Sequence, residues 1–301
     1  MRRPPRLPES LAGRPFPVAD AAARELGRRR LRARDLESPF HGVRQPAGTP
    51  ALAIHRAAAF AARMSPAQMF SHETAAELLG LPIPARIRDG PLHVTSVAPA
   101  RAPRHPGVLG HTARVTPRFV FIGHLRVTSA VETWIALGAV LALDDLIVVG
   151  DALLRRQHPF ASEADIDVAL AGARGRRGYR NLVAARREMR AGVDSPRETH
   201  VRLILTRASL PAPEVNQRHY SATGSYLGRG DLAYPEWKVL IEYDGIQHFV
   251  DESQGHIDVE RLGRFADDGW GIVRINRSNV DIPGYVLAKT IAALRRNGWP
   301  G

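Results

Sequence analysis

Residues 231–244 read DLAYPEWKVLIEYD, and the second half of this stretch decides the fold of the C-terminal third of the chain. Large apolar or aromatic side chains recur at every second position, at Trp237, Val239, Ile241 and Tyr243. The intervening positions carry Lys238, Leu240, Glu242 and Asp244. A period of two places alternate side chains on opposite faces of a β-strand. The stretch therefore predicts a strand with one core face and one face that carries three charges.

The surrounding segments alternate between helical and strand-like patterns. Ser195 and Pro196 begin a helix that runs to about residue 209. Strand-like runs follow at residues 214–221, 226–234 and 236–244, then a helix over 257–268, a strand over 270–276 and a helix over 285–296. The order helix, three strands, helix, strand, helix predicts an α/β domain over residues 193–301.

This order of elements resembles the PD-(D/E)XK nuclease superfamily, because Asp231 begins one strand and Glu242 lies inside the next. Residues 242–248 (EYDGIQH), followed by Asp258 and Arg261 and by residues 269–274 (GWGIVR), are similar to the very-short-patch-repair (Vsr-like) endonuclease class and its uncharacterised relatives. The resemblance implies an αβββαβ restriction-endonuclease-like domain. It also implies roles for four residues: Asp231 and Glu242 as metal ligands, Glu198 as an accessory carboxylate and His248 in proton transfer.

The chain departs from the superfamily pattern at one position. Where the superfamily has a lysine two residues after the second acid, this chain has Asp244. Lys238 would lie roughly 13 Å along the strand from Glu242, whereas Asp244 would lie about 6.6 Å from it. We therefore expect Asp244 to take the catalytic position. The alternatives are that Asp244 only forms a turn with the following glycine and that His248 is a structural polar residue.

Glu198 has two interpretations. Ser195 followed by Glu198 three residues later is the pattern of a capping box, which would account for the glutamate structurally. Glu198 also shares a helical stripe with Val201 and Leu205, and this stripe is expected to face the sheet. A carboxylate that points inward from the helix start could reach a metal site.

The carboxylates indicate which cofactor the site would bind. Carboxylate oxygens suit Mg²⁺ or Mn²⁺, and such an ion would polarise a phosphoryl oxygen and activate water. The alternative is that Asp231 and Glu242 are unrelated surface residues of one sheet. Catalytic residues are expected at Asp231, Glu242, Asp244, His248 and Glu198.

Length and charge add a second region. A chain of 301 residues favours two or more domains, and the absence of cysteine excludes disulfides and thiolate metal sites. Residues 1–193 contain 29 arginines against 16 acidic residues, whereas residues 194–301 are almost neutral. A basic field attracts polyanions, and nucleic acid is the commonest one in cytoplasm. A GC-rich genome would explain arginine in place of lysine but not the excess of basic over acidic residues.

The sequence pattern of the N-terminal segment indicates where DNA would bind. Residues 18–26 and 27–36 have the pattern of two short helices, and residues 41–44 could open a hairpin, so residues 1–50 are interpreted as a winged-helix-like, mostly α segment. The second helix carries the expected nucleic-acid-binding residues Arg28, Arg29, Arg30, Arg32 and Arg34. The alternative is a solvated helix face.

Residues 51–192 are interpreted as a mainly helical, basic region that ends near Gly192. Ser71 and Gly80 bound a predicted helix, and His72 is interpreted as a polar residue at its start rather than a ligand. The residues 71–80 (SHETAAELLG) and 126–134 (RVTSAVETW), with the preceding helices, resemble AbiE-type antitoxins and related regulators.

These patterns lead to one expectation of function and one alternative. The leading prediction is a metal-dependent DNA endonuclease, a hydrolase of phosphodiester bonds, with a basic N-terminal DNA-binding region. The alternative is a transcriptional regulator or antitoxin-like protein in which the nuclease fold is catalytically degenerate. The protein partners to be expected are a second copy of the chain, in a homodimer, or a toxin–antitoxin-type protein. No apolar run is long enough to span a membrane and no export signal is visible, so we expect a cytoplasmic protein.

Overall fold

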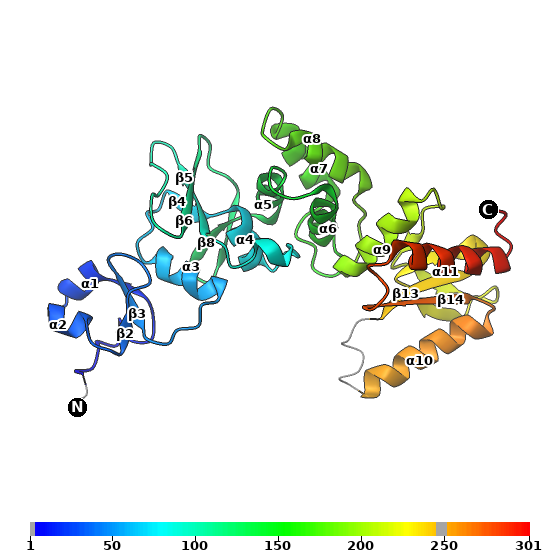
Figure 1. Ribbon diagram of the computed structural model, residues 1–301, viewed down its shortest axis with the longest axis horizontal. Helices are drawn as coiled ribbons and strands as arrows, with labels where there is room; N and C mark the ends of the chain where they lie inside the picture. Colours follow the sequence, from blue (N-terminus) through cyan, green and yellow to red (C-terminus); the bar gives the residue numbers. More distant parts are fainter. Residues whose placement is uncertain (1–3, 245–251) are drawn as a thin grey trace. The chain divides into compact units, whose positions relative to one another are not determined.

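The computed structural model describes residues 4–244 and 252–301, which fall into two compact units (Figure 1). The first unit comprises Met1–Val140 with Gly175–Gly178, and the second comprises Leu141–Arg174 with Tyr179–Gly301. The boundary that the sequence places near Gly192 lies inside the second unit. The reason is that helix α6 (Leu143–Leu153) packs against helix α9 (Pro196–Arg207) across that position.

The first unit opens with a three-stranded sheet of order β1-β3-β2 and two short helices. The hairpin of β2 and β3 stands where the sequence predicts one, but both helices are shorter than expected. Glu25 adopts a left-handed conformation (φ 58°) after the first helix, and Leu36 leaves the second helix to pair with Pro46 in β3. The elements are β1 (Phe16–Pro17), α1 (Val18–Ala22), α2 (Arg28–Leu31), β2 (Leu36–Glu37) and β3 (Val43–Pro46).

A five-stranded mixed sheet of order β6-β5-β4-β8-β7 forms the rest of the first unit. The expectation of a mainly helical region over residues 51–192 misses this sheet, because three of its strands have only three or four residues and the two longer ones mix polar with apolar side chains. Helix α4 ends at Gly80 in a left-handed conformation (φ 69°), as predicted. The elements are α3 (Ala53–Ala61), β4 (Gln68–Phe70), α4 (His72–Leu79), η1 (Ala85–Ile87), β5 (Leu92–Val97), β6 (Val108–Ala113), β7 (Phe119–Ile122), β8 (Leu125–Thr128) and α5 (Ala130–Leu137).

The second unit begins with helices that pack on α9. Asp151 of α6 is buried and accepts hydrogen bonds from Arg202 (2.7 Å) and Thr199 (2.9 Å) of α9. Helices α7 (Glu163–Gly172) and α8 (Tyr179–Glu188) complete this part. Among the described residues, no helix is long and apolar enough to cross a membrane.

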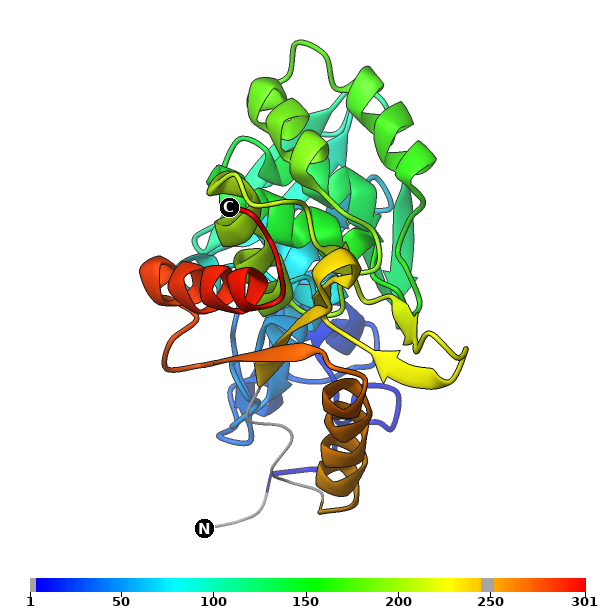
Figure 2. The same ribbon diagram turned by 90° about the vertical axis from the view of Figure 1, so that its right-hand side faces the viewer.

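The sheet of the second unit has strand order β14-β13-β12-β9 and is covered on both faces. Figure 2 shows α11 and α10 on opposite sides of it. Val239 and Ile241 pack into a core with residues of α9 and α11, whereas Leu240 packs against Phe265 of α10. The elements are β9 (Glu214–Val215), β10 (Arg218–Tyr220), β11 (Tyr226–Arg229), β12 (Leu232–Tyr234), η2 (Pro235–Trp237), β13 (Val239–Asp244), α10 (Glu252–Asp267), β14 (Gly271–Asn276) and α11 (Pro283–Arg296).

The order helix, strands, helix, strand, helix is as predicted, with two differences. The first two strand-like runs each divide into two short strands, and β10 pairs with β11 apart from the main sheet. The strand expected from residue 236 begins at Val239, because Pro235–Trp237 form a 3₁₀ turn and Lys238 is left-handed (φ 46°). Val239, Ile241 and Tyr243 share one face as predicted, but the opposite face is not the predicted polar face with three charges, because Leu240 is buried against Phe265 of α10 and Lys238 lies outside the strand.

Candidate active site

Asp231 and Glu242 lie side by side at one end of the sheet of the second unit. Asp231 directly precedes β12, and the antiparallel register that pairs Leu232 with Ile241 brings it opposite Glu242. The Asp231 backbone N–H donates to Glu242 Oε1 (3.2 Å), and the Tyr243 backbone N–H donates to Asp231 Oδ2 (2.8 Å). The structure therefore brings together the two acids that the sequence singles out.

Glu198 adds a third carboxylate from the start of α9. Its backbone N–H donates to Ser195 Oγ (3.2 Å), which confirms the predicted N-cap. Its side chain is 5% exposed and accepts from the Asp194 N–H (3.1 Å) and from Asn216 Nδ2 (2.7 Å). The Asn216 N–H in turn donates to the Asp231 carbonyl (3.0 Å). The Ser195 side chain thus caps the helix, while the Glu198 carboxylate accepts from Asp194 and Asn216 rather than from the Ser195 N–H of a capping box.

The electrostatics show that the three carboxylates interact. Burial raises the pKa of Asp231 well above its usual range, and the neighbouring charges of Glu242 and Glu198 raise it further. The Tyr243 N–H and the Arg261 guanidinium oppose this rise in the pKa of Asp231. Burial also raises the pKa of Glu198. A buried carboxyl group whose ionisation is disfavoured by neighbouring acids, as that of Asp231 is, is characteristic of sites that hold a cation or a proton.

Arg261 supplies the positive charge of the site. Its guanidinium donates to both oxygens of Glu242 (3.0 and 2.6 Å) and to Asp258 Oδ1 (2.6 Å). Burial alone would lower the pKa of Arg261, but the hydrogen bonds and charges of Glu242 and Asp258 raise it. Arg261 belongs to the residues that carry the family resemblance, yet the sequence gives it no role. Its spacing from Asp258, one helical turn, is the only local signal of the ion pair.

Two glycines make room for Arg261 and for the strand beside it. A Cβ atom on Gly228 would lie 2.7 Å from Arg261 Cγ and 2.9 Å from Phe265. A Cβ atom on Gly230 would lie 2.1 Å from Leu240 Cδ1. All three distances are shorter than carbon atoms can approach without a shift of the backbone or side chain. Gly228 therefore allows α10 to pack closely on β11, and Gly230 leaves room for Leu240 of β13.

The other residues expected at the site have different surroundings. Asp244 shares the face of Glu242 and accepts a hydrogen bond from Arg274 Nε (2.7 Å) on β14. Lys238 is outside β13 and donates to the carboxylate of Asp268 (3.0 Å), so it does not take the place of the missing lysine. His248 lies outside the described residues. The cation nearest the paired acids is therefore an arginine from a helix.

The N-terminal arginines do not form one uniform surface. Arg30 is buried and makes a two-point ion pair with Asp35 (2.9 and 2.8 Å), so its guanidinium is already engaged by a carboxylate. Arg28, Arg29, Arg32 and Arg34 are exposed around helix α2. Because that helix spans only Arg28–Leu31, Arg32 and Arg34 lie beyond its end.

The donor set fits a hard divalent cation. Asp231 and Glu198 each use one carboxylate oxygen, Oδ2 and Oε2, in the hydrogen bonds described above. The second oxygen of each can be offered to an ion, as Mg²⁺ and Mn²⁺ prefer. Both oxygens of Glu242 are bound to Arg261, so Glu242 must share its charge between the guanidinium and a metal.

Comparison with known proteins gives limited information. The chain is 31% identical over 150 residues to two proteins of Mycobacterium tuberculosis, "Uncharacterized protein MT2308" of strain CDC 1551 and "Uncharacterized protein Rv2248" of strain H37Rv. The match covers 48% of this chain and 53% of each relative, so the chain spans about half the length of the curated relatives that it matches. No family model matches, and no solved structure matches.

Proposed function

We propose that this protein is a metal-dependent DNA endonuclease whose site is formed by Asp231, Glu242 and Glu198. The observation that carries the proposal is the pairing of Asp231 with Glu242 on adjacent strands, with Glu198 buried next to them through Asn216. Arg261 pairs with Glu242 and Asp258, whereas Asp231 and Glu198 accept hydrogen bonds from backbone N–H groups and from Asn216, so a divalent cation would neutralise carboxylates that Arg261 does not pair with.

Each residue of the site would have its own role. Asp231 and Glu242 would hold Mg²⁺ or Mn²⁺, which when bound supplies charge neutralisation at the phosphoryl oxygens and activation of water. Glu198 would fix the position of Asp231 through Asn216, and Arg261 would orient Glu242. Asp244 and His248 are proposed for proton transfer. The arginine-rich residues 1–193 would attract the DNA backbone.

A plasmid-cleavage assay tests this proposal. Supercoiled plasmid is incubated with the full chain in Mg²⁺, in Mn²⁺ and in EDTA, and nicked and linear products are quantified. We expect cleavage only with metal, and a loss of about 100-fold or more in Asp231→Asn, the usual effect of removing a catalytic group. Glu236→Gln, an exposed carboxylate outside the site, is the matched control and should cut like the parent. Equal cleavage by Asp231→Asn and the parent would contradict the proposal.

A second candidate function is a DNA-binding regulator or antitoxin-like protein with an inactive nuclease fold. The observation that favours it is the engagement of both Glu242 oxygens by Arg261, together with the Asp244–Arg274 ion pair. These contacts resemble a structural ion-pair network more than an open metal site. Binding of the plasmid without cleavage in either metal would support this candidate and reject the first.

A further inference from the structure

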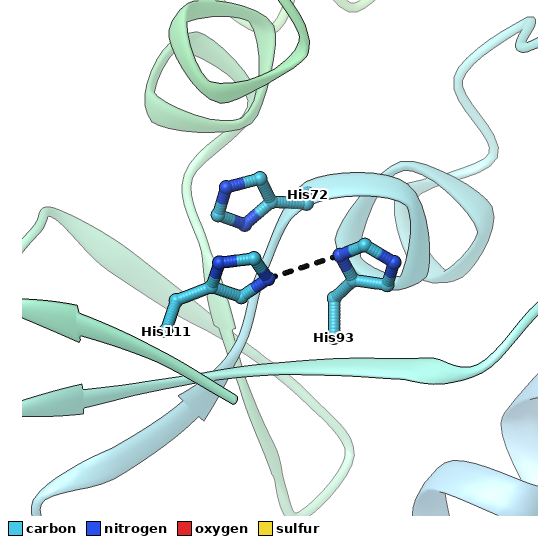
Figure 3. A group of neighbouring side chains, drawn as sticks. All are labelled: His72, His93 and His111. Atoms are coloured by element: carbon cyan, nitrogen blue, oxygen red, sulfur yellow. Dashed lines mark hydrogen bonds between the residues drawn. The ribbon is translucent and has the colours of Figure 1, made fainter. Parts of the chain in front are cut away.

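Three histidines gather at one edge of the five-stranded sheet of the first unit (Figure 3). His72 begins α4, His93 is on β5 and His111 is on β6. In the parallel register of β5 and β6, Thr95 pairs with His111, and His93 precedes Thr95 by two residues, so both histidines share one face. One ring nitrogen of each histidine lies within 4.8 Å of the others.

The contacts within this cluster are unusually close for three imidazoles. His93 Nδ1 is 3.1 Å from His111 Nε2, and the ring of His72 stacks on that of His111 with centroids 3.8 Å apart. The carboxylate of Glu73 lies beside them, with Oε2 3.0 Å from His93 Nδ1. Within the described residues this buried oxygen has no hydrogen bond of acceptable geometry. The cluster therefore combines four potential ligand groups.

The position of His72 has a conformational cost. Its φ is 52°, in the left-handed region that residues with a Cβ atom rarely adopt, and its Nδ1 is 2.9 Å from Ser71 Oγ. Such backbone strain is concentrated at functional sites. A role as an ordinary polar residue at the helix start does not require this conformation. The strained backbone turns the ring of His72 toward His111.

We propose that His72, His93 and His111 bind a divalent transition metal such as Zn²⁺, with the Glu73 carboxylate as an additional ligand or as a partner of His93. Tetrahedral Zn²⁺ with Zn–N bonds of about 2.0–2.1 Å separates its ligand nitrogens by roughly 3.3 Å. The His93 and His111 nitrogens are already at a similar separation. A rotation of the His72 ring off its stack would bring the third nitrogen into range.

Two features of the surroundings support this assignment. Burial lowers the pKa of all three histidines, that of His72 to about 3, so that each ring is neutral and offers a lone pair. His72 and His111 also line a pocket of about 610 Å³ that includes Arg114, Arg176 and Arg177. Three protein ligands beside an accessible pocket are typical of metal sites that keep one coordination position open.

This site is independent of the carboxylates of the second unit. Imidazole nitrogens suit Zn²⁺ and related ions, whereas the Asp231 site offers only oxygens, which suit Mg²⁺. The two sites can therefore be separated by the choice of metal and of variant, and the failure of one proposal leaves the other standing.

Calorimetric titration of the untagged full chain with Zn²⁺, in excess Mg²⁺, tests the proposal. We expect one equivalent to bind, and His111→Ala or His93→Ala to weaken binding by about 100-fold or more, beyond the 10- to 100-fold of a supporting residue. Glu73→Gln should weaken it by about 10-fold. His124→Ala, an exposed histidine between β7 and β8, is the matched control and should bind like the parent.

Cobalt substitution covers the case in which a histidine variant fails to fold by circular dichroism. The parent loaded with Co²⁺ should show the intense visible bands of four- or five-coordinate cobalt, and Asp231→Asn should show the same bands. The absence of stoichiometric Zn²⁺ binding by the parent, a weak octahedral Co²⁺ spectrum, or undiminished Zn²⁺ binding by a folded His111→Ala protein would overturn the proposal.

Discussion

At the scale of single residues, Arg261 determines the surroundings of Glu242. A guanidinium from α10 contacts Glu242, whereas Asp244, two residues further along the strand, pairs with Arg274. A guanidinium binds a carboxylate at two points, whereas an ammonium group binds as a point charge. Arg261 therefore fixes the orientation of Glu242 as well as neutralising it.

Arg261→Ala should destabilise the protein more than the loss of any exposed arginine. Removal of the guanidinium leaves Glu242, whose side chain is 8% exposed, without its partner. The expected loss in the free energy of unfolding is about 3 kcal/mol. Arg274→Ala removes a guanidinium that is 58% exposed and should cost less than about 1 kcal/mol. Urea denaturation measures the free energy of unfolding of both variants. Equal losses would contradict the role of Arg261 as the partner of the buried Glu242.

Asp231→Asn should stabilise the metal-free protein at neutral pH. The pKa of Asp231 is raised by burial and by Glu242 and Glu198, so its favourable contribution is present below the unfolded pKa and is lost as pH rises through the folded pKa. Asparagine removes this penalty but can still accept the hydrogen bond from Tyr243.

The measurement is the melting temperature in EDTA at several pH values. The variant should melt above the parent at pH 7, and the difference should disappear below about pH 4, where the carboxyl group is protonated in both states. A difference that is the same at both pH values would show that the charge of Asp231 is not its source.

The sequence predicts some of these residues and not others. Alternation along β13 and the start of β12 are enough to place Asp231 near Glu242, because both lie within one hairpin-like segment. The role of Arg261 is harder to predict, because its contact with Glu242 depends on how α10 packs on the sheet. The histidine cluster was not predicted, because His72, His93 and His111 are brought together by a strand register that no local pattern encodes.

At the scale of elements, long-range pairing overrides local propensity. Residues 27–36 have a helical pattern, but Leu36 forms a strand because Pro46 of β3 is its partner. In the five-stranded sheet, β4 has only three residues, and β5 and β6, with six residues each, contain neighbouring polar residues such as Thr95 and Ser96 that interrupt a period of two. The elements α9, α11 and β13 lie close to where the sequence predicts them.

Helix α2 gives a prediction about DNA binding. Arg29→Ala with Arg32→Ala should weaken binding to duplex DNA and reduce the slope of log affinity against log salt by about 2, one for each phosphate contact. Arg30→Ala should instead lower stability, because Arg30 is paired with Asp35. Fluorescence anisotropy at several salt concentrations measures the first effect. An unchanged slope would indicate that these arginines form a solvated helix face and do not contact phosphates.

At the scale of the whole molecule, the helices before Gly192 belong with the sheet that follows it. Asp151 and Arg202 have side chains 1% and 3% exposed, and their ion pair joins α6 to α9. Composition and charge change near residue 192, but packing continues across it. Charge is a property of the surface, so it does not report where a hydrophobic core ends.

Fragments of the chain that keep or lose the contact between α6 and α9 should differ in stability. Residues 141–301 should unfold cooperatively, because they retain the partners of α9. Residues 193–301 lose α6 with Asp151 and expose the surface of α9 that α6 covers, including Arg202, so this fragment should be less stable. Circular dichroism during thermal unfolding distinguishes the two. A fragment 193–301 as stable as 141–301 would contradict the importance of the contact.

The same ion pair restricts how genes for such proteins can recombine. A crossover between residues 151 and 202 would join the α6 of one parent to the α9 of another, and would leave the aspartate or the arginine unpaired wherever the second parent lacks its counterpart. Recombinants that exchange sequence before residue 141 keep both partners. The sheet with its carboxylates is therefore expected to be inherited as one block with α6, whereas such an exchange still leaves residues 175–178 of the first unit with the second parent.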